Sequence, residues 1–84
     1  MKITIESTTK IVTLLVNGHA VDARVWQGAS ESGVPVHAFV IRIAPEVPKD
    51  DPRIDELTAQ FERELTRRAD PRPTVETIPL RLII

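Results

Sequence analysis

The sequence contains no cysteine, and it has only three glycines and three aromatic residues. Without a thiol, the chain can form neither a disulfide nor a thiolate zinc site, and it has no cysteine nucleophile. Its two histidines are too few to close a zinc site by themselves. We therefore expect no metal site and no cofactor.

Neither sign of charge dominates. Eleven Lys and Arg residues face twelve Asp and Glu residues, for a formal net charge of −1. General nucleic-acid binders gain much of their affinity by neutralising phosphates, so this balance argues against that class of protein. No apolar run approaches the roughly 20 residues that cross a bilayer, and the N-terminus lacks the features of a signal peptide. We expect a soluble, intracellular protein with no membrane contact.

The length suits one domain, assigned to residues 1–84. A single core of this size leaves only a few kcal/mol of net stability. Self-association as a homo-oligomer is therefore an expectation from size alone.

A β-hairpin is the strongest local signal in the chain. Asn17-Gly18 lies between two alternating, β-branched-rich runs, residues 10–16 and 19–26, as a two-residue hairpin turn requires. Such a turn also sets the register of the two strands. The predicted pairs are Val16 with His19, Leu14 with Val21, Thr13 with Asp22, Val12 with Ala23, Ile11 with Arg24 and Thr9 with Trp26.

Three further strands are predicted around this hairpin. Residues 1–6 alternate apolar and polar side chains, and residues 7–9 lead from them into the hairpin. Residues 27–33 are small and polar and predict a loop, followed by a strand over 34–43 that is apolar on both faces. Residues 78–84 alternate again and predict a closing strand.

One helix is predicted between the last two strands, after a proline-containing linker at 44–49. Asp51 and Pro52 suit the N-cap and first helical positions, and the prolines within 70–73 end the helix. Spacings of three and four place the apolar side chains on one stripe, which predicts a helix packed on the sheet. The stripe consists of Ile54, Leu57, Phe61 and Leu65.

The predicted fold is therefore α+β, with the order ββββαβ. It is a four- to five-stranded, mainly antiparallel sheet with one helix on one face. Because one helix covers only one face, something else must cover the other. A second copy of the chain, meeting its equivalent through Trp26 or the final strand, is one solution, and a sheet that curls over itself is the other.

No motif in the sequence indicates catalysis. Residues 28–33 match the glycine spacing of a phosphate-binding loop, but Val34-Pro35 stands where that motif needs Lys and Ser or Thr. No nucleophile elbow surrounds any serine, and the helix carboxylates occupy positions typical of solvated side chains. We expect a protein that is not an enzyme.

The sequence indicates a recognition site at one place, on the second strand of the predicted hairpin. Arg24 and Trp26 are two residues apart on one strand and share a face, where they suit stacking and charge contacts with a planar anion or a partner protein. The alternative is that Arg24 and Trp26 only pack in an interface between proteins, where such pairs are also common. His37 lies in an apolar strand, where a buried, hydrogen-bonded ring is the usual outcome. The candidate ligand- or partner-binding residues are Thr9, Arg24, Trp26, His37 and Arg42.

Short segments over nearly the whole chain resemble a group of small uncharacterised proteins of bacteriophages and prophages. They are residues 5–8 (IEST), 17–18 (NG), 23–28 (ARVWQG), 31–37 (ESGVPVH), 60–65 (QFEREL) and 78–83 (IPLRLI). This chain differs in a longer segment before the Asn-Gly turn and a longer lead into the helix. The group has no known active site, so the resemblance assigns no role to any residue.

The resemblance implies a phage accessory protein made in the cytoplasm of the bacterial host. Such proteins include blockers of CRISPR complexes and oligomeric sponges that sequester cyclic nucleotides or related immune signals. Our leading hypothesis is a non-catalytic, oligomeric, counter-defence sponge for a nucleotide-type signal. The alternative is a protein-protein inhibitor or adaptor that blocks a host defence protein without a small ligand. An enzyme that degrades the nucleotide would need catalytic groups that the sequence does not display.

Overall fold

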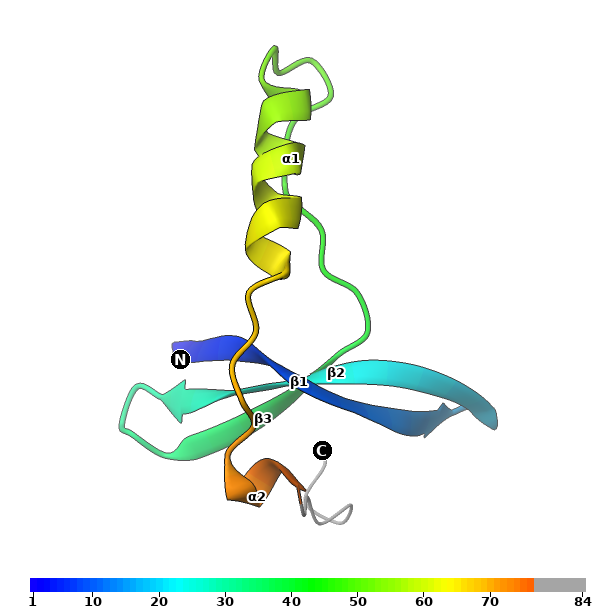
Figure 1. The fold of residues 1–84 in the computed structure, drawn as a ribbon, viewed down its shortest axis with the longest axis vertical. Helices are drawn as coiled ribbons and strands as arrows, with labels where there is room; N and C mark the ends of the chain where they lie inside the picture. Colours follow the sequence, from blue (N-terminus) through cyan, green and yellow to red (C-terminus); the bar gives the residue numbers. More distant parts are fainter. Residues whose placement is uncertain (77–84) are drawn as a thin grey trace.

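The computed structural model describes residues 1–76 (Figure 1). Its elements are β1 (Ile3–Val16), β2 (His19–Ser30), β3 (Pro35–Val40), α1 (Ile54–Leu65) and α2 (Pro73–Glu76). The strands form one antiparallel sheet in the order β1-β2-β3. The α+β class is confirmed, but the sheet has three strands in the described part of the chain, not four to five. The closing strand expected at 78–84 lies outside the described residues.

A bulge in β1 explains the smaller number of strands. The hairpin register from Val16–His19 to Ile11–Arg24 is as predicted, and the turn residues Asn17 and Gly18 both have positive φ. Beyond Ile11 the register shifts, and three residues of β1, 8–10, lie opposite one residue of β2. The segment expected to separate two strands is therefore an irregularity within one long strand.

The same bulge corrects the predicted pairing of Trp26. Its partner on β1 is Ser7, not Thr9. A register extrapolated from the turn assumes regular pairing, and the two extra residues of the bulge displace everything beyond it.

Thr8 is fully buried and holds the bulge together. Its hydroxyl donates to the Val25 carbonyl oxygen at 2.6 Å and accepts from the Lys10 backbone N–H at 3.2 Å. Its own carbonyl oxygen accepts from Arg24 Nη1 at 2.9 Å. Side chains thus satisfy polar groups at the bulge that regular strand pairing would otherwise satisfy.

β2 runs further than the sequence suggested, because Gly28 is a strand residue and not part of a loop. It lies in the middle strand, opposite Ile5 on β1 and Val36 on β3. A Cβ at this position would overlap the Thr4 carbonyl oxygen, so only glycine allows β1 to approach so closely. The loop comprises only residues 31–34, where Gly33 has a φ of +89°.

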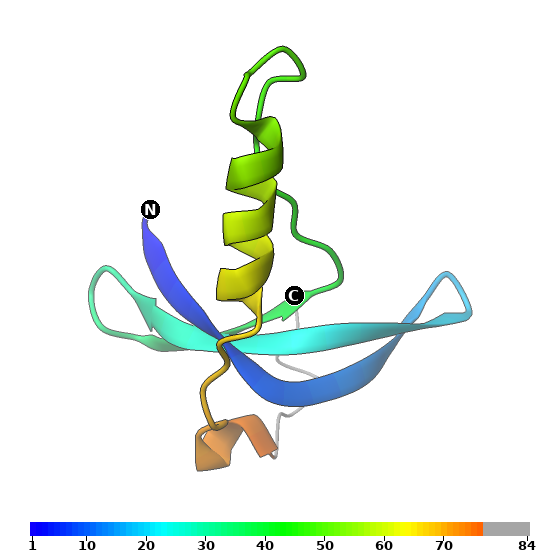
Figure 2. The same cartoon turned by 45° about the horizontal axis from the view of Figure 1, so that its top comes forward.

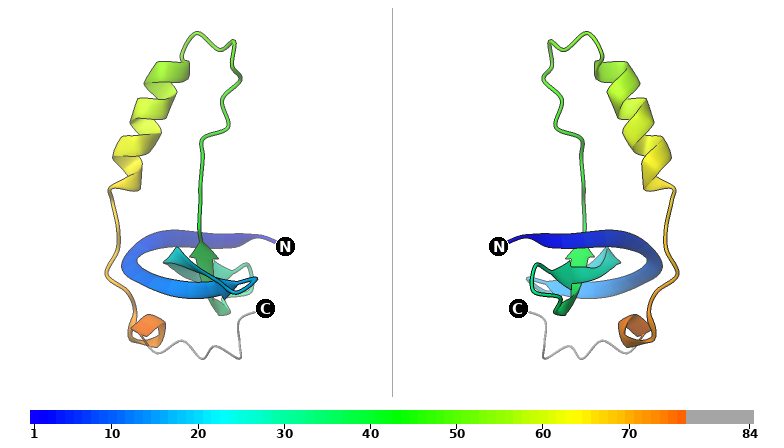
Figure 3. Two further views of the ribbon diagram at one scale, coloured as in Figure 1. Left: turned by 90° about the vertical axis from the view of Figure 1, so that its right-hand side faces the viewer. Right: turned by 90° about the vertical axis from the view of Figure 1, so that its left-hand side faces the viewer.

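The helix does not pack on the sheet as predicted. Residues 41–65, which we call the arm, leave the end of β3, extend away from the sheet and return through α1 (Figures 1 and 3). No α1 residue is buried, and the predicted apolar stripe is only half-buried. Pro45 and Pro48 favour an extended backbone, which carries the chain away from the sheet before the helix begins. No helix within residues 1–76 combines the length and the apolar character needed to span a bilayer.

Both ends of the helix differ from the expected positions. Asp51 precedes the helix in a turn, where its carboxylate accepts from the Arg53 N–H at 2.8 Å, and α1 begins at Ile54. The helix ends at Leu65, before the prolines expected to stop it. The Thr66 hydroxyl donates to the Arg63 carbonyl oxygen at 2.7 Å and satisfies one of the terminal carbonyl groups.

The chain that follows the helix crosses the sheet instead (Figure 2). Ala69 forms a parallel bridge with Thr8, through hydrogen bonds of 3.2 Å from Thr9 N to Ala69 O and 2.9 Å from Ala69 N to Ser7 O. The buried Gln27 amide donates to the Asp70 carbonyl oxygen at 3.2 Å and accepts from Arg72 N at 2.9 Å.

The side chain of Arg72 continues this crossing contact. Its Nη2 lies 3.2 Å from the Gly28 carbonyl oxygen and 3.3 Å from that of Val36, so it reaches both β2 and β3. Among the described residues, only Ala23 and Val25 are fully buried apolar side chains. Polar contacts therefore supply much of what fixes this segment to the sheet.

Replacing Gly28 by Ala is expected to destabilise the protein by more than about 2 kcal/mol, because the new methyl group meets backbone atoms of β1 that cannot rotate away. Gly33→Ala is the control. Its Cβ meets no atom, and only its positive φ opposes the change, by about 1 kcal/mol. Urea unfolding followed by circular dichroism measures both, and equal losses would contradict the close approach at Gly28.

Thr8→Val keeps the side-chain volume but removes the hydroxyl that serves Val25 and Lys10. We expect a loss of about 2 kcal/mol in the free energy of unfolding, since buried polar groups lose their partner. Thr13→Val is the matched control. It removes an exposed 2.9 Å hydrogen bond to Asp22 and should change stability by less than about 0.5 kcal/mol. A Thr8 variant as stable as the Thr13 variant would show that the bulge does not need this hydroxyl.

Candidate functional site

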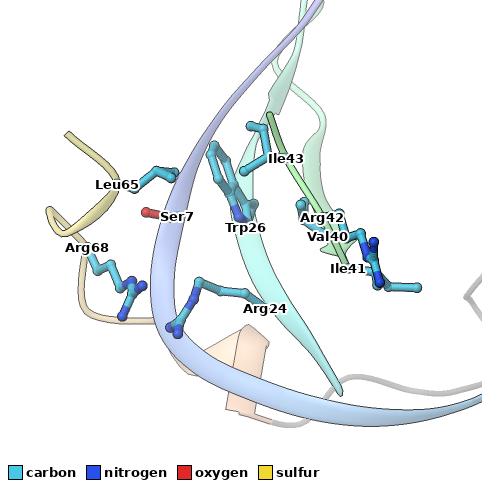
Figure 4. A pocket seen from close by; sticks show the side chains of 9 residues that line it. All are labelled: Ser7, Arg24, Trp26, Val40, Ile41, Arg42, Ile43, Leu65 and Arg68. Carbon is cyan, nitrogen blue, oxygen red and sulfur yellow. The ribbon is translucent and has the colours of Figure 1, made fainter. Parts of the chain in front are cut away.

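A small open pocket lies where the base of the arm meets the sheet (Figure 4). Its volume is about 170 Å³. Its lining residues come from β1, β2, β3, both ends of the arm and the segment after α1. They are Ser7, Arg24, Trp26, Val40, Ile41, Arg42, Ile43, Leu65 and Arg68.

The indole of Trp26 has room beside it because its neighbours on the sheet are small. Across the ladders it pairs with Ser7 on β1 and Ala38 on β3, and two residues further along β2 stands Gly28. Residues two apart on a strand share a face, so this side of the sheet is shallow around the indole. The bulge contributes directly, because it brings Ser7 opposite Trp26 in place of Thr9.

The arm supplies the apolar walls. Figure 4 shows Leu65, from the last turn of α1, and Ile43, from the segment after β3, on either side of Trp26. Trp26 is half-buried, and Ile43 retains 48% of its exposure. The indole is therefore accessible from the pocket and is not sealed beneath the helix.

The charge of the pocket is entirely positive. Arg24, Arg42 and Arg68 are its only charged lining residues, and no carboxylate is among them. Arg24 and Arg68 approach the same side of the pocket (Figure 4). Desolvation of Arg24 and, to a lesser degree, the charge of Arg68 lower the pKa of Arg24 from its ordinary value. Guanidinium groups nevertheless remain protonated at neutral pH, so the pocket favours an anion.

Hydrogen bonds hold parts of this site in place. Arg24 Nη1 donates to the Thr8 carbonyl oxygen at 2.9 Å, which fixes the guanidinium against the bulge. The Ser7 hydroxyl donates to the Arg67 carbonyl oxygen at 3.1 Å, next to Arg68. The bulge thus positions residues on both sides of the pocket.

The structure brings three of the five candidate residues together. Arg24, Trp26 and Arg42 line the pocket. His37 pairs with Gln27 and lies on the opposite face of the sheet. Thr9 is exposed within the bulge and does not line the pocket.

Sequence analysis missed Ser7, Leu65 and Arg68 as site residues. The periodicity predicts Leu65 as part of the helix stripe and Ser7 as part of a connection, and Arg68 falls just before the prolines expected to end the helix. No local pattern marks Arg68, because the return of the chain from the arm to the sheet brings it to Arg24. Within residues 1–76, no group of three or more His, Asp and Glu side chains is placed to hold a metal ion.

The cationic lining should be visible in the fluorescence of Trp26, the only tryptophan. At constant ionic strength we expect the ratio of the iodide slope to the caesium slope to exceed the ratio for free N-acetyltryptophanamide at least about twofold, because the arginines concentrate anions near the indole. Arg68→Gln should reduce the iodide slope and leave quenching by neutral acrylamide unchanged. Arg63→Gln, on the exposed side of α1, is the charge-matched control. A slope ratio no greater than that of the free indole would contradict a positive potential at Trp26.

Comparisons with protein-family models, curated proteins and solved structures gave no match to this chain. Any function of the pocket therefore rests on its own residues.

Proposed function

We propose that this chain is a non-catalytic binding protein that takes up a planar, phosphate-bearing small molecule at the Arg24–Trp26 pocket. In the phage setting that the sequence resemblance implies, the ligand is a nucleotide-type immune signal, and binding sequesters it from the host. The observation that carries the proposal is an accessible indole in a pocket that three arginines line, with no carboxylate in the lining.

The chemistry of these groups supports a nucleotide-type ligand over a simple anion. Arginine forms charge-assisted, often bidentate hydrogen bonds with phosphate oxygens. An indole stacks on any nucleobase, because every base presents a π-face. Only a ligand with both a flat ring and a negative group uses Trp26 and the arginines together.

The size of the pocket limits how such a ligand sits. Sites for drug-sized ligands have volumes of about 300–1,000 Å³, whereas this pocket has about 170 Å³. It has room for one base or one phosphate group, and the remainder of the ligand would lie along the exposed rim formed by Ile41 and Arg42. The proposal therefore concerns a partly exposed ligand.

Isothermal titration against a panel of cyclic dinucleotides and trinucleotides tests the proposal. We expect at least one member to bind in the micromolar range or tighter, with affinity falling as salt rises. Trp26→Ala and Arg68→Gln should each weaken binding by about 10-fold or more, through loss of stacking and of a phosphate contact. Arg63→Gln should have no effect, because this exposed residue does not line the pocket.

Two outcomes would contradict this function. The first is an absence of heat and of thermal shift with every member at protein concentrations of several hundred micromolar. The second is chemical change of a bound nucleotide, seen by chromatography after incubation, because sequestration predicts recovery of the intact molecule.

The alternative function is that of a protein-protein inhibitor or adaptor of a defence complex. The observation that favours it is the exposed apolar surface around the pocket, where Ile41 and Ile43 remain about half exposed. Affinity capture from infected cells separates the two functions. A stoichiometric protein partner whose binding is lost in Ile43→Glu supports the alternative, and a co-purifying nucleotide supports sequestration.

A further inference from the structure

The arginines of the pocket lie on two sides of Trp26. Trp26 belongs to β2, the middle strand of the sheet. Arg68 precedes Ala69, which forms a bridge with β1, whereas Arg42 lies shortly after the end of β3. Figure 4 shows Arg24 and Arg68 on one side of the indole and Arg42 on the other. Positive charge therefore flanks the indole on both sides.

The backbone around Arg68 is fixed to β1. The Ser7 hydroxyl donates to the Arg67 carbonyl oxygen at 3.1 Å, and the Ala69 N–H donates to the Ser7 carbonyl oxygen at 2.9 Å. Because Ser7 binds the residues on both sides of Arg68, the fold itself brings this arginine to the pocket. Such preorganisation lowers the cost of binding a ligand.

Arg24 and Arg68 together form a position for one phosphate group. The bond from Arg24 Nη1 to the Thr8 carbonyl oxygen holds the Arg24 guanidinium on the side of the pocket where Arg68 lies. Burial and, second to it, the charge of Arg68 lower the pKa of Arg24, as expected where two like charges repel. No carboxylate in the pocket lining offsets this repulsion. A phosphate group between the two arginines would do so through charge-assisted hydrogen bonds.

Arg42 forms a second position for a negative group. Its side chain is exposed and lies across the indole from Arg24 and Arg68 (Figure 4). The outer strands β1 and β3 are separated by β2, and neighbouring strands lie about 4.8 Å apart, so the two positions belong to segments about 10 Å apart. One phosphate group in contact with Arg24 and Arg68 would leave Arg42 unused. Two negative groups, one on each side of a flat ring, would use all three arginines.

We propose that the pocket selects a nucleoside that carries a phosphate group on both sides of its sugar, at the 5′ position and at the 2′ or 3′ position. This inference rests on the proposed function and refines it, because every nucleoside of a cyclic dinucleotide has this arrangement. The base stacks on Trp26, one phosphate binds Arg24 and Arg68, and the other binds Arg42. Since Arg42 and Arg68 are exposed, both phosphates lie at the rim and only the base enters the volume of about 170 Å³.

Selection against ordinary nucleotides follows from the same arrangement. ADP and ATP carry all their phosphates in one chain at the 5′ position. With the base on Trp26, that chain reaches the arginines on one side of the indole only. The position of the negative charge, and not its amount, is therefore what the pocket recognises.

Isothermal titration with two probes of equal phosphate number tests this selection. Adenosine 3′,5′-bisphosphate has one phosphate on each side of the sugar, and ADP has both on one side. We expect the bisphosphate to bind at least about 10-fold more tightly than ADP, because only the bisphosphate gains the charge-assisted contact with Arg42. 3′,5′-Cyclic di-AMP is the third probe, since it has the same arrangement of phosphates.

Two variants separate the two phosphate positions. Arg42→Gln should weaken the bisphosphate and cyclic di-AMP by about 10-fold and leave ADP unchanged. Arg68→Gln should weaken all three probes, because each places a phosphate beside Arg24 and Arg68. Both side chains are exposed, so neither change is expected to disturb the fold. Arg63→Gln, which removes the same charge outside the pocket, should affect none of the probes.

The outcomes distinguish this inference from the proposed function. If cyclic dinucleotides bind but Arg42→Gln does not weaken them, or if ADP binds as tightly as the bisphosphate, the two-sided arrangement is overturned and the nucleotide-binding function stands. If no cyclic dinucleotide, cyclic trinucleotide or adenosine probe binds at several hundred micromolar protein, the proposed function fails and this inference fails with it.

Discussion

The hydrogen bond from the buried Thr8 hydroxyl to the Val25 carbonyl oxygen is the interaction on which the rest of this structure depends. It holds a bulge that lets β1 bend and still pair with β2 along both of its halves. The bulge brings Ser7 opposite Trp26 and offers the backbone groups to which Ala69 binds. One polar side chain thus connects the strand register, the site and the return of the chain from the arm.

Polar contacts hold the segments of this chain together, where a larger domain relies more on a hydrophobic core. Only two apolar side chains are fully buried in the described residues, and the Gln27 amide and the Arg72 guanidinium bind the chain after α1 to the sheet. The apolar stripe of α1 is only half-buried. The chain therefore keeps apolar surface exposed, although polar contacts hold its segments together.

The candidate pocket forms where the sheet meets the base of the arm and the segment that follows α1. The sheet supplies the indole, one arginine and a floor of small residues, and the arm and its return segment supply Leu65, Ile43 and Arg68. An arginine cluster without a carboxylate is unfavourable for the isolated protein, since like charges repel, and binding an anion relieves that repulsion. This relief of repulsion supports the proposed binding of an anion.

Sequence alone determined the features that depend on neighbouring residues. The Asn17-Gly18 turn, the hairpin register as far as Ile11–Arg24 and the stripe of α1 follow from local backbone preferences and side-chain periodicity, and the structure confirms them. Arg24 and Trp26 were also placed on one face correctly, because alternation along a strand is local.

Tertiary structure alone decided the bulge, the position of the helix and the completion of the pocket. The Thr8 hydroxyl finds its acceptor 17 residues away, and the Gln27 amide meets Asp70 across 43 residues, so no short pattern reveals either contact. The packing of α1 was mispredicted for the same reason, because periodicity shows that a helix has an apolar face but not which surface covers it.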